Sequence, residues 1–131
     1  MPRVQRLTVP DLAPPPGYAH VVVATGTRLV TTAGAMPLDG EGDLVGAGDV
    51  RAQARQTLYN LMRQLEAAGA GGEDVLKTTV YVASNDRADL VACWEEVQQS
   101  PLAAAASTLL GVALLGAVGQ LVEIEAIAVL S

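Results

Sequence analysis

The sequence predicts an α+β protein in which two helices cover one face of a single mixed six-stranded sheet. Valine- and threonine-rich runs occur near both ends of the chain and in its middle, and two longer segments have helical spacing of apolar residues. Half of the 131 residues are hydrophobic, yet only 3% are aromatic and phenylalanine is absent. The core must therefore be built from Val, Leu, Ile and Ala, which suits helices packed on a sheet. This length predicts a single domain over residues 1–131.

The first third of the chain predicts strands joined by turns. Residues 4–9 form a short alternating segment that fits an edge strand, and the three prolines of residues 11–17 exclude a helix there. Residues 19–25 and 28–33 are strand-like runs separated by Gly26 and Thr27, which predicts a hairpin between them. A loop rich in Gly and Asp follows, over residues 37–48.

Two helices alternate with the remaining strands. Asp49 is a candidate cap for the first helix, Gly69–Gly72 end it, and its apolar face is Ala54, Leu58, Leu61, Met62 and Leu65. A β-branched strand is expected over residues 75–82 and a second helix over 86–98. The inward positions of that helix are expected to be Leu90, Val91, Trp94 and Val97. Residues 107–112 and 121–130 supply the last two strands.

Two helices leave one face of such a sheet uncovered. A chain this small and apolar buries that face most simply against a partner subunit, so self-association is expected. Residues 102–118 carry no charge and are nearly as long as a membrane-spanning helix, which is the alternative interpretation of this segment. Pro101, the interrupting glycines and the absence of flanking Lys or Arg argue against it, and no membrane partner is expected.

Charge and composition exclude several function classes. The formal net charge is -6, which repels phosphate backbones, so no nucleic-acid partner is expected. The chain has one cysteine, Cys93, and one histidine, His20, so neither a disulfide nor a metal site is expected. Met1–Asp11 lacks the apolar core of a signal peptide, and a cytoplasmic location is the default expectation.

Few residues point to chemistry on their own. Both His20 and Cys93 are interpreted as structural, because a lone histidine is usually so and no base lies near the cysteine in sequence. Glu123 and Glu125 share one face of an otherwise apolar strand, where two carboxylates repel each other. The alternative for this pair is a solvated face with neighbouring cations.

Three stretches resemble motifs of one known family. The first is Gly17-Tyr18 with residues 29–37 (LVTTAGAMP), and the second is residues 56–81, with Q-x-L-x-N-L, a helix ending in AAGA, and D-V-x-K-T-T-V-Y. The third runs from Gly111-Val112-Ala113 to V-E-I-E-A-I-A at residues 122–128. In order and spacing the chain resembles the RidA (YjgF-like) family from end to end.

The resemblance implies a homotrimer of chorismate-mutase-like subunits with ligand clefts at the subunit boundaries. Family members with the complete motif hydrolyse enamines and imines formed from amino acids, and they need no metal or organic cofactor. Residues carried over on matching positions are Tyr18 and Gly34, which would line the cleft, and Glu123, which would position the attacking water. Ala33 and Ala35 replace the family's serine and glutamine on either side of Gly34.

The family's substrate-binding arginine, in P-A-R-S, has no counterpart. Alignment through Val112-Ala113 places Ser107 at the arginine position, whereas alignment on the Ser-Thr pair places Ala106 there, and no arginine follows Arg87. Neither a hydroxyl nor a methyl group replaces a bidentate guanidinium–carboxylate contact. We therefore expect weak or no activity on 2-imino acids and a neutral or cationic small-molecule ligand. Glu123 and Ser107 are the catalytic candidates, and Tyr18, Gly34, Ala35 and Ala106 the binding candidates.

Two other functions remain open at this point. One is a small-molecule-binding module that keeps the shape of the cleft without its chemistry. The other is an endoribonuclease, an activity attached to the family's name. The net charge and the lack of a histidine pair for acid–base work argue against the endoribonuclease.

Overall fold

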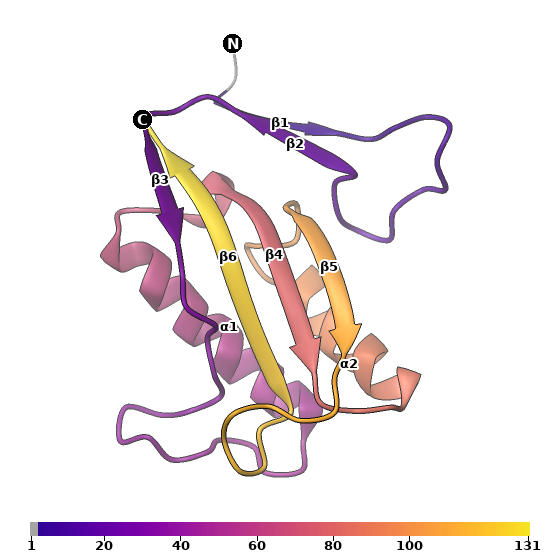
Figure 1. Ribbon diagram of the computed structural model, residues 1–131, viewed down its shortest axis with the longest axis vertical. Coiled ribbons are helices and arrows are strands. Elements are labelled where there is room, and N and C mark those ends of the chain that lie inside the picture. Colours follow the sequence, from indigo (N-terminus) through magenta and orange to yellow (C-terminus); the bar gives the residue numbers. More distant parts are fainter. Residues whose placement is uncertain (1–2) are drawn as a thin grey trace.

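The computed structural model describes residues 3–131 (Figure 1). Within them, six strands, two α-helices and one short 3-10 helix follow one another along the chain. They are β1 (Val4–Leu7), β2 (Val21–Ala24), β3 (Arg28–Thr31), α1 (Val50–Ala67), η1 (Gly72–Asp74), β4 (Val75–Val82), α2 (Arg87–Gln98), β5 (Ala106–Gly111) and β6 (Val122–Leu130).

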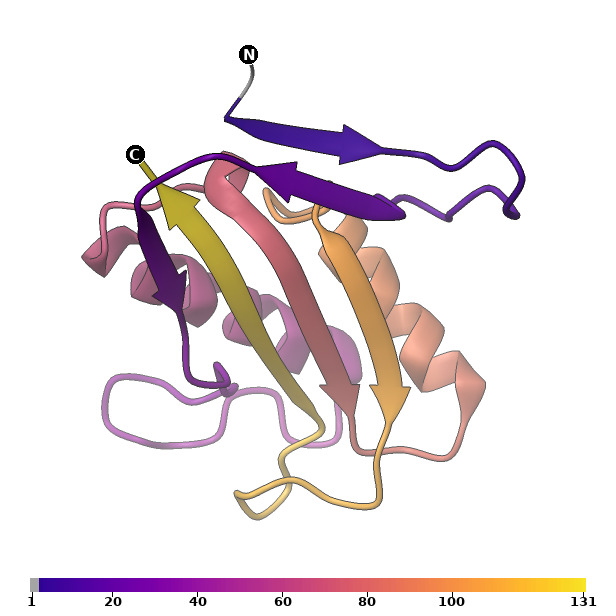
Figure 2. The same ribbon diagram turned by 45° about the horizontal axis from the view of Figure 1, so that its top comes forward.

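Four strands form a mixed sheet in the order β3-β6-β4-β5. β4 pairs with β5 in parallel, and β6 is antiparallel to both of its neighbours. The helix α2 connects the two parallel strands, and both helices lie behind the same face of the sheet (Figures 1 and 2). The predicted α+β layer of two helices on a mixed sheet is confirmed.

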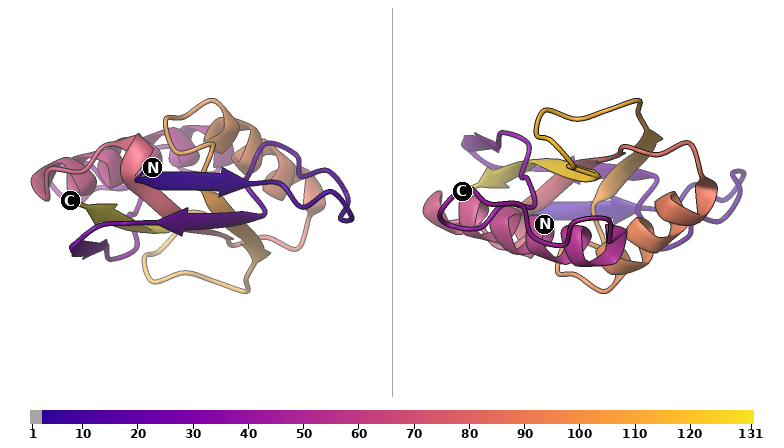
Figure 3. Two further views of the ribbon diagram at one scale, coloured as in Figure 1. Left: turned by 90° about the horizontal axis from the view of Figure 1, so that it is seen from above. Right: turned by 90° about the horizontal axis from the view of Figure 1, so that it is seen from below.

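The remaining two strands differ from the expectation of a single six-stranded sheet. β1 and β2 pair with each other in a separate hairpin, which crosses one end of the four-stranded sheet (Figures 2 and 3). The predicted hairpin around Gly26-Thr27 does not form, because β3 pairs with β6 instead of β2. The chain turns against the end of β6 there: Thr27 N donates to Leu130 O at 3.0 Å, and a Cβ on Gly26 would lie 2.6 Å from the same oxygen.

The first helix begins at the predicted cap Asp49, and the second is capped by Asp86, the first residue of its expected range. The Asp49 side chain accepts from Ala52 N, and the Asp86 side chain accepts from Ala88 N, which satisfies backbone donors that a helix start leaves free. The predicted α1 positions Ala54, Leu58, Leu61 and Leu65 are buried in the core. In α2, Val97 is buried as expected, but Val91 is 55% exposed. Cys93, two residues further along the helix, is buried in the core instead.

The two faces of the four-stranded sheet have different surroundings. Alternate residues such as Thr78, Val80 and Ile124 point to the helices and are buried. The opposite face, here called the open face, carries polar residues together with Leu29, which is 70% exposed, and Ile127, which is 38% exposed. Exposed apolar residues on this face fit the expectation that it needs a cover.

In the part of the chain that the structure describes, no helix has the length and apolarity that crossing a membrane requires. The apolar run of residues 102–118 is divided among a turn, β5 and the loop that leads to β6 (Figure 1).

Candidate functional site

Glu123 is held by three neighbours near the start of β6. Its Oε1 accepts a hydrogen bond from Gln120 Nε2 at 3.0 Å. Gly34 packs directly against its side chain, since an ideal Cβ on Gly34 would lie 2.6 Å from Glu123 Cδ. Ala35 keeps Gly34 in place by exchanging two backbone hydrogen bonds with Ile124, of 2.7 and 3.2 Å. We call Gly34, Ala35, Gln120 and Glu123 the glutamate half-site.

Gln120 is itself fixed by its surroundings. Only 3% of it is exposed. Its Oε1 accepts from Ala117 N at 3.0 Å, and its Nε2 also donates to Val122 O at 3.0 Å. Another rotamer of this buried amide would leave its hydrogen-bonding groups without partners, so Gln120 stays in place and orients the Glu123 carboxylate.

The second carboxylate of the strand is engaged elsewhere. Tyr81 lies opposite Glu123 in the β4–β6 register, and its hydroxyl donates to Glu125 Oε1 at 3.0 Å. This hydrogen bond, together with burial and the charges of both glutamates, raises the pKa of Tyr81. Because Glu125 is paired with a neutral phenol, Glu123 is the carboxylate of this face that is free to face a ligand.

A separate hollow surrounds Tyr18. Its volume is about 280 Å³, and its lining is Pro16, Tyr18, Trp94, Ser107 and Leu109, here called the tyrosine pocket. The rings of Tyr18 and Trp94 meet edge to face with centroids 5.9 Å apart. The indole Nε1 of Trp94 donates to Pro16 O at 3.0 Å, so the helix α2 also fixes the proline-rich segment that forms one wall.

Ser107 supplies a polar group to this pocket. Its Oγ accepts from Thr78 Oγ1 at 2.8 Å, and Thr78 is 1% exposed. A hydroxyl has one proton and two acceptor positions, so Ser107 has hydrogen-bonding capacity beyond its contact with Thr78. None of the five lining residues is charged.

The structure groups Ser107, and not Ala106, with Tyr18. Ser107 pairs with Thr78 in the β4–β5 register, and both side chains point to the helix-covered side. Ala106 is the adjacent residue of the same strand, so it points to the open face, where its register partner is Lys77. Ser107 therefore lines the tyrosine pocket and Ala106 does not, while the assignment of the arginine position to Ser107 stays a prediction.

The predicted site residues therefore form two groups within one chain. Thr78, the partner of Ser107, precedes Tyr81, the partner of Glu123, by three residues of β4. That separation is roughly 10 Å along the strands and about as much across them, since β5 and β6 lie on opposite sides of β4. Ser107 and Glu123 also face opposite sides of the sheet. One subunit alone cannot bring a single small ligand to both.

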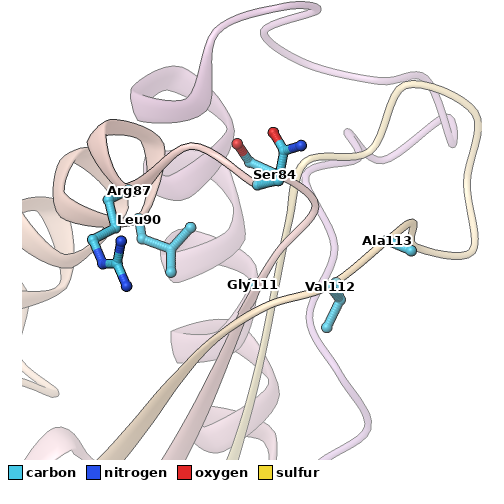
Figure 4. A pocket seen from close by; sticks show the side chains of 7 residues that line it. Ser84, Arg87, Leu90, Gly111, Val112 and Ala113 are labelled. Carbon is cyan, nitrogen blue, oxygen red and sulfur yellow. The ribbon is translucent and has the colours of Figure 1, made fainter.

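A larger hollow at the carboxyl ends of β4 and β5 contains an arginine. Its volume is about 420 Å³, and its lining includes Ser84, Arg87, Leu90, Gly111 and Val112 (Figure 4). Gly111 lies four residues beyond Ser107 on β5, roughly 13 Å along the strand. Arg87 therefore does not supply the missing guanidinium to the tyrosine pocket of its own chain.

His20 and Cys93 have structural environments. His20 Nδ1 accepts from Val9 N at 2.9 Å, and its Nε2 lies 3.0 Å from Ala13 O, so both ring nitrogens hold the N-terminal segment. Burial, with a smaller contribution from Glu96, raises the pKa of Cys93 to about 12, which keeps the thiol protonated. Among residues 3–131 no three His, Cys, Asp or Glu side chains cluster in a way that would hold a metal ion.

Two residues of these half-sites could not be assigned to a ligand site from the sequence. Trp94 packs against the core, as its helical spacing predicts, but it is only half-buried and also lines the tyrosine pocket. Gln120 lies in a charge-free stretch that was considered only for its apolar character. Its position three residues before Glu123 is the signal that could have revealed it.

The mixed sheet with two helices on one face and the V-E-I-E strand at its centre define a class of small α+β subunits. A sequence profile of the family described as Endoribonuclease L-PSP matches residues 10–130. A RutC family protein from Synechocystis is 38% identical over 120 residues, which cover 90% of this chain and 89% of that protein. The chain therefore belongs to the RidA (YjgF-like) family.

Two further similarities bear on fold and chemistry. A Rid family protein of unknown function from Yersinia pestis, YyfB, has a TM-score of 0.91 at 32% identity, over 98% of this chain and 99% of that one. A 2-iminobutanoate/2-iminopropanoate deaminase from Salmonella typhimurium is 46% identical over 68 residues. That match spans about half of each protein, 51% of this chain and 52% of the deaminase.

Proposed function

We propose that this protein hydrolyses a small imine or enamine that carries no carboxylate, in clefts between the subunits of a homotrimer. The glutamate half-site of one subunit would face the tyrosine pocket of the next. The observation that carries this proposal is that one chain holds both an oriented carboxylate at Glu123 and a separate pocket that no charged residue lines. The separation of the two half-sites within one chain supports an intersubunit site.

Glu123 supplies the acid–base chemistry of this reaction. Its carboxylate accepts a proton from a water molecule while the water oxygen bonds to the carbon of the protonated imine, which gives a carbinolamine. The Glu123 carboxyl returns that proton to the carbinolamine nitrogen, the C–N bond breaks as the carbonyl forms, and the hydroxyl proton passes to solvent. An enamine follows the same steps once its carbon has been protonated, and in each case one water is consumed and one ammonia released. Gln120 and Gly34 contribute by fixing the carboxylate, because general-base catalysis depends on position within hydrogen-bond reach.

The tyrosine pocket sets the kind of substrate. Pro16, Trp94 and Leu109 offer apolar surface, and Ser107 offers one hydroxyl. A substrate carboxylate placed there would lose its hydration without gaining a cation, which costs on the order of a few kcal/mol. A neutral imine avoids this cost, and a protonated imine is attracted to Glu123. We therefore expect poor turnover of 2-imino acids.

The competing function is a small-molecule-binding protein that catalyses no reaction. The tyrosine pocket would serve such a protein equally well. Ammonia release separates the two. Imines produced by an amine oxidase should release ammonia faster when the protein is present, and Glu123→Ala should remove the acceleration. Equal rates with and without the wild-type protein, together with saturable binding of the imine's stable amine analogue, would favour the binding module. Full activity of Glu123→Ala would exclude Glu123 from the mechanism.

A further inference from the structure

The segment that connects β1 with β2 forms one wall of the tyrosine pocket but has few hydrogen bonds of its own. Residues 8–20 make this connection as the long loop beyond the hairpin (Figure 1). Most of residues 10–17 are exposed, and the four prolines among them have no backbone N–H to donate. Side chains outside this stretch must therefore hold Pro16 and Tyr18 in place.

The helix α2 holds one end of the segment. Trp94 Nε1 and Gln98 Nε2 both donate to Pro16 O, at 3.0 and 2.8 Å. Beyond Pro16, the ring of Tyr18 meets that of Trp94 edge to face. These contacts all lie at the end of the segment that leads into β2, so its beginning needs a separate anchor.

His20 is that anchor. Its ring spans the turn at residues 9–13, where Nδ1 lies 2.9 Å from Val9 N and Nε2 lies 3.0 Å from Ala13 O. A backbone N–H only donates and a carbonyl oxygen only accepts, so Nδ1 carries no proton and Nε2 carries one. The two partners therefore require a neutral imidazole in a single tautomer. A second proton, on Nδ1, would face the N–H of Val9, and that hydrogen bond would be lost.

The same ring is in contact with the pocket. His20 follows Tyr18 by two residues, and their rings meet edge to face with centroids 6.3 Å apart. Between them, Ala19 is buried, and its N donates to Ala105 O at 3.4 Å, directly before β5. A change at His20 therefore reaches Tyr18 through a ring contact and through one buried residue.

We propose that His20 is a positioning residue of the tyrosine pocket, and that it holds the pocket in shape only while it is neutral. Between about pH 8 and about pH 5, where histidines ordinarily gain a proton, the turn at residues 9–13 would lose its anchor. Pro16 and Tyr18 would then be held from one side only, and the pocket would open to water. This inference rests on the proposed function in taking the tyrosine pocket as a ligand site, but it requires neither catalysis nor a second subunit.

Histidine is the one type of side chain around this turn that ordinarily titrates near neutral pH. The other ionisable groups on β1, on the segment and on the half of α2 that contacts it are Arg6, Asp11, Tyr18, Glu95 and Glu96. Carboxyl groups ordinarily titrate near pH 4, and phenols and guanidinium groups at about pH 10 or above. The arginine donates to Glu73 O, and the two glutamates are paired with arginines of α1. A response between about pH 8 and about pH 5 is therefore expected from His20.

The chain has one histidine and one tryptophan, so the two events can be followed separately. The nitrogen NMR spectrum of the imidazole reports the protonation of His20 in the wild type. Acrylamide quenching of Trp94 fluorescence reports how open the pocket is, and would be measured on the wild type, His20→Ala and His20→Gln from about pH 8 to about pH 5. Far-ultraviolet circular dichroism on the same samples checks that each remains folded.

We expect the wild-type quenching constant to rise, and Trp94 emission to shift to the red, as the pH falls. The midpoint should coincide with the protonation of His20. His20→Ala should show the raised constant at every pH. His20→Gln should keep the low constant at every pH, because an amide offers one acceptor and donor hydrogens that do not titrate in this range. Cys93, beside Trp94, stays a thiol throughout, since burial raises its pKa to about 12.

A wild-type constant that stays level while His20 gains its proton would overturn the proposal, and so would a pH response that persists in either variant. If His20→Ala fails to fold, the comparison of the wild type with His20→Gln still decides. A constant in His20→Gln that is raised already at the highest pH would show that the two hydrogen bonds do not order the pocket, and would contradict the proposal. None of these measurements uses a substrate. A protein that releases no ammonia from imines but shows the expected Trp94 response would therefore overturn the proposed function and leave the role of His20 standing.

Discussion

Gly34 leaves the space in which the Glu123 carboxylate lies. A Cβ at position 34 would approach Glu123 Cδ to 2.6 Å and Cγ to 2.7 Å, so any side chain there would displace the carboxyl group. The backbone of Gly34 does not require glycine for conformational reasons, because it is not among the residues with positive φ. Glycine is needed at position 34 because a larger residue would occupy the space of the Glu123 side chain.

The variant Gly34→Ala should therefore impair activity more than stability. Displacing Glu123 by about 1 Å is expected to lower kcat by on the order of 10²-fold, because general-base catalysis is sensitive to position. Steady-state kinetics and a thermal melt on the same sample measure the two effects. A variant with wild-type kcat would show that Glu123 works from another position or does not take part.

Glu123→Gln and Glu125→Gln form a matched pair on one strand. Removing the base at 123 is expected to lower the rate of ammonia release by about 10²- to 10⁴-fold. The same change at 125 should leave the rate nearly unchanged, because that carboxylate is paired with Tyr81. Equal losses in both variants would mean that the two carboxylates act as one unit.

The pairing of Tyr81 with Glu125 predicts a pH dependence. Because its pKa is raised in the folded protein, Tyr81 favours the fold in its neutral form. This contribution is complete below the unfolded value, near pH 10, and is lost as the pH rises through the higher folded value. The difference between the ultraviolet titration curves of the wild type and of Tyr81→Phe gives the titration of the Tyr81 phenol alone. The Glu125→Gln variant should titrate at lower pH than the wild type; an unchanged midpoint would contradict the pairing.

Ser107→Arg tests which residue occupies the position of the missing arginine. A guanidinium in the tyrosine pocket should bind a carboxylate such as benzoate at least about tenfold more tightly than the wild type, since charge-assisted pairs are the stronger ones. Ala106→Arg is the control, because it projects from the open face. Calorimetric titration measures both. Tighter binding to Ala106→Arg alone would assign the position to 106.

Much of the fold could be predicted because its signals are local. The helix caps Asp49 and Asp86 and the spacing of Leu58, Leu61 and Leu65 act within a few residues. The division of the strands into two sheets could not be predicted, because it depends on the pairing of Arg28 with Leu130 across the whole chain. Val91 has the spacing of an inward residue, but α2 turns a neighbouring stripe with Cys93 toward the core.

For the candidate site, too, local features could be predicted from the sequence and long-range ones could not. Glu123 and Gly34 were found from motif positions, and the structure places them in contact. The place of Trp94 in the tyrosine pocket was not apparent, because the helical spacing that predicts its contact with the core does not show that part of its ring stays exposed. The separation of Ser107 from Glu123 was also not apparent, because it follows from strand order and from which face each residue occupies. Both features are set by tertiary pairing.

The central claim is that this cleft keeps the carboxylate of Glu123 but not the means to bind a substrate carboxylate. It is tested most directly by comparing kcat/KM for ammonia release from an uncharged imine with that for a 2-imino acid of the same size, in the wild type and in Ser107→Arg. We expect the wild type to prefer the uncharged imine and Ser107→Arg to shift the ratio toward the 2-imino acid. A wild type that prefers the 2-imino acid would contradict it.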